Sequence, residues 1–281
     1  MYSENREDLL TRVASLYYEY DYSQQQIAEM LQISRSNISR LLKEAKQKGL
    51  VEIRIHKRIA TSPALERDFQ ERFGLHQAMV VDQRNADYSE RLAAAGQLAA
   101  WYLEGILRPN TVLGIAWGTG VASAVNALTP HPVLHIDVVQ ILGTVGTVVS
   151  EIDGPDLARR LATKLGGQYH YMHAPLFVDS QTARDILLEQ PTIQLTLNQA
   201  RKAQIALVGV GTTERESSSF LRAGHLTEQQ LYELRTLGVV GETAGKYFDM
   251  NGNSDFDINQ RVVAISLTDL RRIPFVVAVA C

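Results

Sequence analysis

The chain has 281 residues, of which 45% are hydrophobic, and a net charge of −3. This length supports two cores, so we expect a small and a large domain and no disordered protein. The single cysteine, Cys281, excludes a disulfide framework and a cysteine-based metal site. The first 20 residues lack the pattern of a signal peptide, and no apolar run is long enough to cross a bilayer. We therefore expect a soluble, cytoplasmic protein without membrane contact.

Positive charge is concentrated near one end of the chain. Between Arg35 and Arg58, eight Lys or Arg residues accompany two acids, a local charge of +6 that leaves −9 on the rest. A basic segment attached to an acidic body indicates a polyanionic partner at that end, with nonspecific binding suppressed elsewhere.

Residues 1–58 have the pattern of a winged helix-turn-helix domain. Apolar residues three and four apart predict a helix from Leu9 to Tyr20. Ser23 is placed to cap a second helix over residues 24–31, and Ser34 to cap a third that ends at Gly49. The alternating run over residues 51–56 predicts the strand of a wing.

The third predicted helix has two chemically different faces. Ile38, Leu41, Leu42 and Ala45 fall on one side, and hydrogen-bonding or cationic groups fall on the other. In a recognition helix, Arg contacts guanine edges, Ser and Asn reach other base edges, and Lys meets phosphates. The residues that we expect at double-stranded operator DNA are Ser34, Arg35, Ser36, Asn37, Ser39, Arg40 and Lys43.

The stretch from Ser23 to Leu42 also resembles the helix-turn-helix of bacterial repressors, with small Ala28 in the second helix. Gln32 stands where the turn usually has glycine. We therefore expect Gln32 to adopt the left-handed backbone conformation, at a free-energy cost of about 1 kcal/mol. The alternative is a plain three-helix bundle with a solvated basic face. The serine caps, the wing pattern and the local charge together favour DNA binding.

Residues 59–76 are predicted to form a linker and an amphipathic helix. Residues 60–63 have the composition of a hinge, and residues 64–73 place Leu65, Phe69 and Phe73 on one face before Gly74 ends the helix. Such a helix either pairs protomers or packs on its own domain, and its pattern favours neither.

From residue 77 to residue 281, β-rich runs alternate with helical ones. We expect strands at residues 78–81, 111–116, 135–142, 168–172, 205–209, 262–265 and 275–280, and helices at residues 88–107, 155–165 and 227–237. This order is typical of an α/β, Rossmann-like domain with a mainly parallel sheet and helices on both faces. In such sheets, ligands bind beyond the carboxyl ends of the strands.

Small and polar residues follow several of these strands. The segment 111–120 passes through Gly118 and Gly120 into a helix that starts near Val121, so backbone amides and a helix N-terminus form an anion cradle with Thr119 as an extra donor. Each glycine alone is weak evidence for a ligand-binding site. Asp249 is equally consistent with a residue that forms a turn. The residues that we expect at the effector are Trp117, Gly118, Thr119, Gly120, Gln140, Leu142, Gly143, Gly209, Gly211, Gly241, Phe248 and Asp249.

Other chemistries lack support. The pair Gly209 and Gly211 is followed by Glu214, whose carboxylate would repel the pyrophosphate of NAD. The motifs of P-loop ATPases, zinc proteases and serine hydrolases do not occur. No third metal ligand is evident beside His170 and His173, which favours a structural role for these two residues. We therefore expect no metal and no cofactor.

Taken together, these residues resemble the SorC family of sugar-binding transcription regulators over essentially the whole chain. The matching pieces are residues 17–18 with 23–42, 114–120, 139–143, 174–175, 208–211, 248–249 and 273–280. The resemblance implies a sensor domain like that of phosphosugar isomerases and deaminases, a phosphorylated sugar as effector, and a homotetramer on the operator.

The resemblance also implies roles for individual residues. Gly118, Thr119 and Gly120 would hold the phosphate, Gln140 and Gly143 would line the sugar, and Asp249 would accept its hydroxyl groups. Leu142 replaces a lysine of some members, so no imine with a sugar aldehyde is expected at that position. The family continues beyond the position of Cys281 with a Gly and Lys segment that helps to hold phosphate, so we expect the domain of residues 77–281 to be truncated.

We accordingly expect a DNA-binding transcription regulator that is controlled by a phosphorylated sugar and is not an enzyme. The alternative is an isomerase-like or deaminase-like enzyme fused to a DNA-binding module, for which Asp153, Glu242 and Asp249 are the candidate acids and bases. A further alternative is an effector that is not a sugar, such as a nucleotide.

Overall fold

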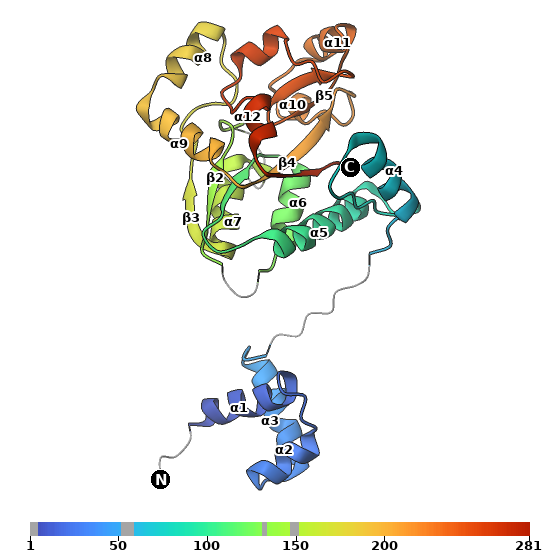
Figure 1. The fold of residues 1–281 in the computed structure, drawn as a ribbon, viewed down its shortest axis with the longest axis vertical. Helices are drawn as coiled ribbons and strands as arrows, with labels where there is room; N and C mark the ends of the chain where they lie inside the picture. Colours follow the sequence, from blue (N-terminus) through green and yellow to red (C-terminus); the bar gives the residue numbers. More distant parts are fainter. Residues whose placement is uncertain (1–4, 52–58, 131–133, 147–151) are drawn as a thin grey trace. The chain divides into compact units, whose positions relative to one another are not determined.

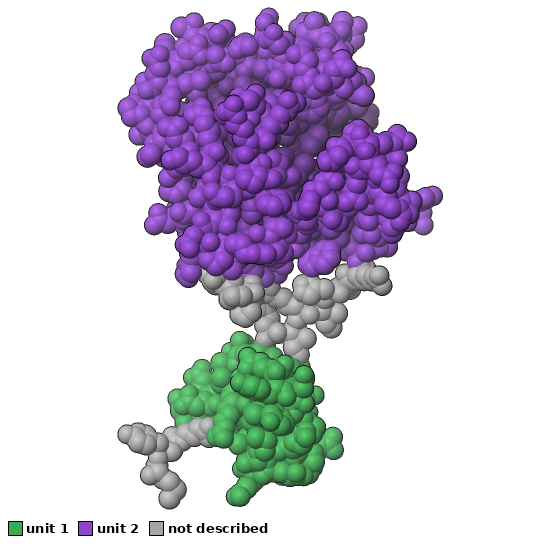
Figure 2. Space-filling model, in the orientation of Figure 1, with its two compact units in different colours: residues 1–58 green, residues 59–281 purple. Residues whose placement is uncertain are grey.

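The computed structural model describes residues 5–51, 59–130, 134–146 and 152–281. The chain forms two compact units, residues 1–58 and residues 59–281 (Figure 2). Each unit has its own cluster of buried apolar side chains.

The first unit contains three helices, α1 (Arg6–Tyr18), α2 (Gln24–Leu31) and α3 (Arg35–Gln47). Ser23 caps α2 in a full capping box with Gln26, and Ser34 caps α3 by accepting the N–H of Asn37 at 3.2 Å. The expected helix boundaries are therefore confirmed to within a few residues. Tyr20 lies beyond α1 and is exposed, which corrects its assignment to the apolar face. The predicted wing at residues 51–56 lies, apart from its first residue, outside the described residues.

The turn between α2 and α3 has the expected strained residue. Gln32 ends α2 with φ 55° and ψ 39°, in the left-handed region. The turn directs α3 across α1 and α2, and the buried side chains of the three helices meet in one small core. The side chains buried in α3 are Ile38, Leu41, Leu42 and Ala45, as its sequence pattern predicts.

The second unit begins with α4 (Pro63–Phe73) and the long helix α5 (Tyr88–Ile106). Gly74 ends α4 in the left-handed conformation with φ 61°. The strand expected at residues 78–81 does not form, since this segment makes only one isolated bridge, between Thr61 and Val81.

A seven-stranded sheet forms the centre of the second unit. Its strands are β1 (Val112–Ile115), β2 (Ile136–Gln140), β3 (Gly166–His170), β4 (Ile205–Thr212), β5 (Val239–Thr243), β6 (Lys246–Asp249) and β7 (Phe275–Val279). Strands β3, β2, β1, β4 and β7 are paired in parallel, with β4 between β1 and β7. The end of β4 pairs antiparallel with β5, and β5 pairs antiparallel with β6.

Helices cover both faces of this sheet (Figure 1). They are α6 (Thr119–Ala127), α7 (Gly154–Leu165), α8 (Gln181–Leu188), α9 (Pro191–Arg201), α10 (Ser219–Arg222), α11 (Glu228–Thr236), the short 3₁₀ helix η2 (Asp257–Arg261) and α12 (Leu267–Arg272). Helices α6 and α7 connect β1, β2 and β3 in one direction, and α8 and α9 return the chain to β4 on the other side of β1. Right-handed crossovers place these two sets of helices on opposite faces.

Two expectations about the sheet were wrong. Residues 262–265 form isolated bridges with Leu142 and Phe177 and no strand. The β5–β6 hairpin was not expected, and it places Gly241 inside a strand and not at a strand-to-helix turn. The mainly parallel α/β architecture is confirmed.

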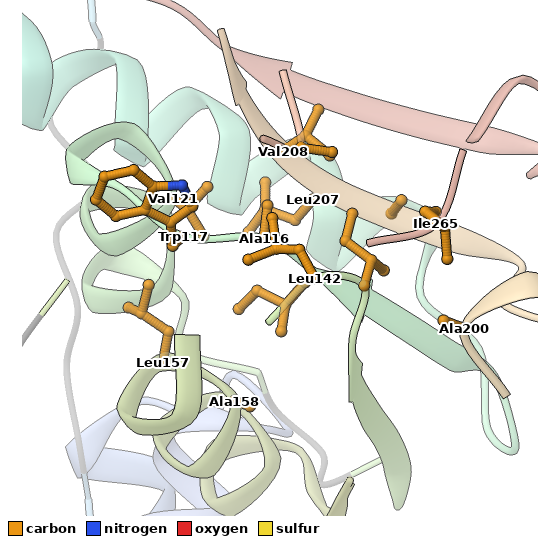
Figure 3. Close-up of a cluster of buried hydrophobic side chains, with 14 of the residues drawn as sticks. Ala116, Trp117, Val121, Leu142, Leu157, Ala158, Ala200, Leu207, Val208 and Ile265 are labelled. Atoms are coloured by element: carbon orange, nitrogen blue, oxygen red, sulfur yellow. The ribbon is translucent and has the colours of Figure 1, made fainter. Parts of the chain in front are cut away.

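The core of the second unit lies on both sides of β1 and β2. Leu113 and Ile115 of β1 are fully buried, and such side chains stabilise a fold by about 1.5–3 kcal/mol each. Figure 3 shows Trp117 of the β1–α6 connection and Val121 of α6 among the side chains of this core. These buried side chains therefore fix the position of the backbone between β1 and α6.

Candidate effector site and DNA-binding helix

A cavity of about 240 Å³ lies where the connections after β1 and β4 diverge. The two strands are neighbours in the sheet, and their following segments leave in different directions, which opens a crevice at their carboxyl ends. We call it the switch-point cavity. It is lined by Tyr88, Leu92, Ala116, Trp117, Gly118, Thr119, Gly120, Gly209, Val210, Gly211, Thr212, Ser217, Ser219, Arg222, Glu242, Ala244, Val279, Ala280 and Cys281.

One wall of the cavity is the N-terminus of α6. Gly118 is the N-cap, with φ 110° and ψ 171°, a conformation that is essentially restricted to glycine. Its N–H donates to the carbonyl of Ile152 at 3.1 Å, which fixes the loop. No side chain caps α6. The first amides of the helix, at Thr119, Gly120 and Val121, have no partner within the helix and are available to an anion.

The opposite wall comes from β4 and β5. Gly209 and Gly211 of β4 line the cavity together with Glu242 of β5, whose side chain is buried. A Cβ at Gly211 would collide with the Glu242 carboxyl group, so glycine is needed there for this carboxyl to occupy its place. Burial raises the pKa of Glu242 to about 7, because desolvation disfavours the anion.

Hydroxyl groups and one guanidinium complete the lining. Thr212, Ser217 and Ser219 supply hydroxyls, and Arg222 at the end of α10 donates to the Ser219 Oγ at 3.3 Å. Trp117 also lines the cavity, and its ring packs at a tilt against that of Phe220, with ring centroids 4.9 Å apart. Ser217, Ser219 and Arg222 were not predicted, because their segment follows the long strand β4 without a glycine motif. The polar run at residues 212–219 was the available signal.

The structure brings six of the twelve predicted effector residues to the cavity, namely Trp117, Gly118, Thr119, Gly120, Gly209 and Gly211. Gln140, Leu142 and Gly143 do not line it. Gln140 is buried, and its Oε1 accepts the N–H of Met172 at 3.0 Å. Leu142 lies in the apolar core (Figure 3), and a Cβ at Gly143 would meet the carbonyl of Pro175 at 2.5 Å.

The remaining predicted residues lie in the β5–β6 hairpin. Gly241 is paired with Phe248 across the hairpin. Asp249 accepts the N–H groups of Asn251 at 2.9 Å and Asn253 at 2.8 Å, the behaviour of a turn former. These three residues are not part of the cavity lining.

The carboxyl groups nominated for catalysis are not brought together. Asp153 caps α7 and accepts the N–H groups of Val145, Gly146 and Gly154. Asp249 holds its turn. Of these two and Glu242, only Glu242 lines the switch-point cavity.

In the first unit, α3 presents the predicted DNA-contacting residues. Six of the seven are exposed, and Asn37 is half-buried. Asn37 accepts a hydrogen bond from Arg40 at 2.8 Å, which orients this guanidinium on the helix surface. The acid of this helix, Glu44, is paired with Arg6 at 2.6 Å and with Lys48 at 3.7 Å. The exposed face of α3 is therefore cationic and rich in hydroxyl groups.

Two further features concern the described part of the chain. None of its helices combines the length and hydropathy that a bilayer crossing requires. It contains no group of three or more His, Cys, Asp or Glu side chains placed to hold a metal ion.

A helix-turn-helix unit joined to a Rossmann-like domain with a polar cavity at its switch point defines a ligand-responsive transcription regulator. Comparison with known proteins agrees. Residues 57–281 match the family model described as "Putative sugar-binding domain", and residues 8–67 match a Crp-like helix-turn-helix domain. The chain belongs to the SorC family of sugar-binding transcription regulators.

Similar proteins cover nearly the whole chain. The deoxyribonucleoside regulator of Bacillus subtilis is 31% identical over 267 residues, 95% of this chain and 85% of that protein. The crystal structure of the full-length sorbitol operon regulator SorC of Klebsiella pneumoniae has a TM-score of 0.75 at 27% identity, covering 98% of this chain and 89% of that one. A DeoR family transcriptional regulator from Listeria monocytogenes has a TM-score of 0.69 at 26% identity, covering 77% and 85%. The chain is accordingly a DNA-binding transcription regulator with a sugar-binding domain.

Proposed function

We propose that the effector is a phosphorylated sugar, bound in the switch-point cavity, and that its binding controls the affinity of α3 for operator DNA. The observation that carries this proposal is the uncapped N-terminus of α6, which opens into a cavity lined by hydroxyl groups and a buried carboxyl group. A helix N-terminus attracts a phosphate, and the other groups suit sugar hydroxyls.

The two ends of the cavity suit the two ends of such a ligand. The amides of Thr119 and Gly120, with the Thr119 hydroxyl, would hold the phosphate, and Arg222 adds a positive charge to the same lining. Glu242 and Thr212 would bind sugar hydroxyls on the opposite wall. With a pKa of about 7, Glu242 is largely protonated below neutral pH, so it can donate a hydrogen bond without repelling the phosphate.

On the DNA side, we propose that Arg35 and Arg40 contact base edges and that Lys43 contacts a phosphate. An operator read by such helices has two half-sites, so we propose a homo-oligomer, and a tetramer in line with the family. Arg40→Ala is expected to weaken operator binding by about 1–3 kcal/mol and to relax sequence preference at one position.

The effector proposal is tested by thermal shift with matched ligands. Pentose and hexose phosphates, the same sugars without phosphate, nucleotides and inorganic phosphate are compared on the wild-type chain. A phosphosugar is expected to raise the melting temperature, because a ligand that binds only the folded state stabilises it. Stabilisation by the unphosphorylated sugars or by nucleotides, without any by phosphosugars, would contradict the proposal.

The variant Gly118→Ala provides the site control. An alanine at φ 110° is strained, so the loop before α6 must move and the phosphosugar shift is expected to be lost. Gly105→Ala, at an exposed helical position with open space around it, is the matched control and is expected to keep the shift.

In gel-shift assays at low salt, the wild-type chain is expected to bind duplex DNA, and the complete absence of binding would refute the regulatory function.

One observation favours a second function. Glu242 has a pKa near neutrality inside the cavity, as a general acid or base requires. Turnover of a hexose or pentose phosphate by the wild-type chain, lost in Glu242→Ala, would establish an enzyme. We expect no turnover, because the other two nominated carboxyl groups lie outside the cavity lining and form caps and turns.

A further inference from the structure

The first turn of α5 belongs both to the switch-point cavity and to the surface of the second unit. Tyr88, the first residue of α5, lines the cavity together with Leu92, which lies one turn later on the same face of the helix. Residues 88–91 are all exposed, and Tyr88 is 48% exposed. The side chain of Tyr88 is therefore free to pack against a molecule in the cavity.

The remainder of α5 is fixed on its neighbour α6, beside which it runs (Figure 1). The carbonyl of Leu92 accepts a hydrogen bond from the Ser123 hydroxyl at 2.9 Å. A Cβ at Gly96 would lie 2.6 Å from the backbone of Ser123, so the two helices are in very close contact there. Helix α6 also provides the proposed anion site at its N-terminus. A ligand held by α6 therefore has a movable neighbour on α5, namely the first turn that precedes this contact.

Hydrogen bonds tie the chain before α5 to this first turn. The carboxylate of Asp87 accepts the N–H of Glu90 at 2.8 Å, and the N–H of Asp87 donates to the Glu90 carboxylate at 3.1 Å, which completes a capping box. Arg91 donates to the carbonyl of Ala86 at 3.0 Å. The connection that leads into α5 is consequently expected to move together with Tyr88.

The same connection reaches the start of the second unit. The N–H of Ser62 donates to the carbonyl of Val80, and the N–H of Asp82 donates to the carbonyl of Ala60, each at 2.8 Å. These two bonds flank the isolated bridge of this segment. Glu66 of α4 accepts the N–H of Val80 at 3.0 Å. We call Ala60, Ser62, Glu66, Val80 and Asp82 the linker clamp.

The linker clamp lies between the cavity and the DNA-binding unit in the order of the chain. The first unit ends at Arg58, two residues before Ala60. On the other side of the clamp, residues 83–87 are all that separates Asp82 from Tyr88. A displacement at the cavity therefore has a short, hydrogen-bonded route to the residues that carry the DNA-binding unit.

We propose that Tyr88 packs on the phosphosugar and that the linker clamp transmits its displacement to the residues that follow the DNA-binding unit. The inference deepens the proposed function and rests on it. A tyrosine ring offers an apolar face to the C–H groups of a sugar and a hydroxyl to its polar groups. By this contact the phosphosugar binds one position of the first turn of α5 more tightly than another, which any control of DNA affinity requires.

The first test follows the linker clamp by amide hydrogen exchange in the full chain. The probe is the pentose or hexose phosphate that raises the melting temperature most. At saturation, it is expected to slow exchange at least about fivefold in peptides that cover residues 60–66 and 78–84, because the amides of the clamp lie there. Slower exchange at α6 with unchanged exchange in these peptides overturns the proposal.

Variants of Tyr88 show whether the effect passes through this side chain. Tyr88→Ala is expected to abolish the slower exchange in the clamp peptides at saturating probe, whereas Tyr88→Phe keeps the ring and is expected to retain it. Tyr232→Ala is the matched control, since Tyr232 is 67% exposed on α11 and outside the cavity lining. Circular dichroism shows whether the variants are folded. Full protection of the clamp in Tyr88→Ala refutes the role of Tyr88.

The second test disrupts the clamp without touching the cavity. Glu66→Ala removes the acceptor of the Val80 N–H, whereas Glu66→Gln keeps an oxygen for it. Glu66→Ala is expected to bind the probe with wild-type affinity, since Glu66 is outside the cavity lining. The factor by which the probe changes DNA affinity is expected to fall at least about fivefold.

This factor is measured with a duplex that the purified chain selects from a random-sequence library. Glu66→Gln is expected to keep the wild-type factor. Glu71→Ala, at an exposed position of the same helix, is the matched control and is also expected to keep it. A wild-type factor in Glu66→Ala refutes the route through the clamp.

These experiments separate the inference from the proposed function. If a nucleotide and no phosphosugar stabilises the chain, the proposed effector is wrong, and the exchange experiment with that nucleotide decides whether the route exists. If a phosphosugar binds and changes DNA affinity while the clamp peptides exchange as before, the proposed function stands and the route is wrong.

Discussion

The carboxyl group of Glu242 is buried, so its charged form is costly in free energy. Burial raises its pKa from 4.5 to about 7, against the opposing effect of a hydrogen bond from the backbone of Gly245. The folded chain therefore keeps a proton on Glu242 that the unfolded chain releases above about pH 4.5. The stability associated with this proton is complete below pH 4.5 and is lost as the pH rises through 7.

Glu242→Gln is expected to remove this pH dependence. Between pH 4.5 and pH 8, the free energy of unfolding of the wild-type chain should fall by about 3 kcal/mol relative to that of the variant. The difference isolates Glu242, because other titrating groups, such as Lys246 with its pKa lowered to about 8, are common to both chains. Urea unfolding at several pH values measures it. Parallel profiles for the two chains would show that Glu242 does not retain its proton.

Two glycines of β4 provide a matched test of the cavity. At Gly211 a Cβ would collide with the Glu242 carboxyl, whereas at Gly209 its nearest neighbour would be the carbonyl of Trp117 at 3.7 Å, an ordinary contact. Gly211→Ala is expected to displace Glu242 and to weaken binding of the phosphosugar at least about tenfold, since a buried polar contact worth about 1–3 kcal/mol is disturbed. Calorimetric titration of both variants checks this. Equal losses in Gly209→Ala would mean that crowding alone, and not the position of Glu242, controls affinity.

At the scale of the element, the α2–α3 turn contains a strained residue. Gln32 has φ 55°, a conformation that glycine adopts without penalty. Gln32→Gly is expected to stabilise the first unit by about 0.5–1 kcal/mol. Gln25→Gly, within α2, is expected to destabilise it by about 1 kcal/mol. Hydrogen exchange of the α3 amides in the full chain measures both effects, and slower exchange in Gln25→Gly would contradict this account.

Elements with strong local signals were predictable from the sequence. The serine caps and the apolar spacing defined α2 and α3, and the apolar runs at β1 and β4 defined the centre of the sheet. The glycines after β1 identified one wall of the cavity because a parallel strand places its following loop at a known edge. This information is local to each segment.

The missed elements depend on information that is not local. The β5–β6 hairpin turns through Ala244 and Gly245, both with positive φ, and alanine is not a signal for such a turn. Residues 262–265 have the composition of a strand, but their neighbours in the fold leave room only for isolated bridges. Arg222 reaches the cavity through the short helix α10, so its place in the site followed from tertiary structure alone. Glu242 was a candidate acid or base of the enzyme alternative, but its place in the cavity lining depends on the unexpected hairpin.

At the scale of the whole molecule, two units with separate cores must communicate if the effector is to control DNA binding. An effector changes DNA affinity only if it binds one arrangement of the units more tightly than another. The charge distribution supports separate partners for the two units, because the net charge is +6 between Arg35 and Arg58 and −9 over the remainder of the chain.

The communication between effector and DNA leads to a last prediction. By thermodynamic linkage, the factor by which a phosphosugar changes operator affinity equals the factor by which operator DNA changes phosphosugar affinity. Arg40→Ala, on the exposed face of α3, should leave phosphosugar affinity in the absence of DNA unchanged, since Arg40 is outside the cavity lining, but weaken operator binding both with and without the phosphosugar. Calorimetric titration with each ligand, alone and in the presence of the other, measures the two factors. If both factors are one for the wild-type chain, the phosphosugar does not control DNA binding and the proposed function is wrong.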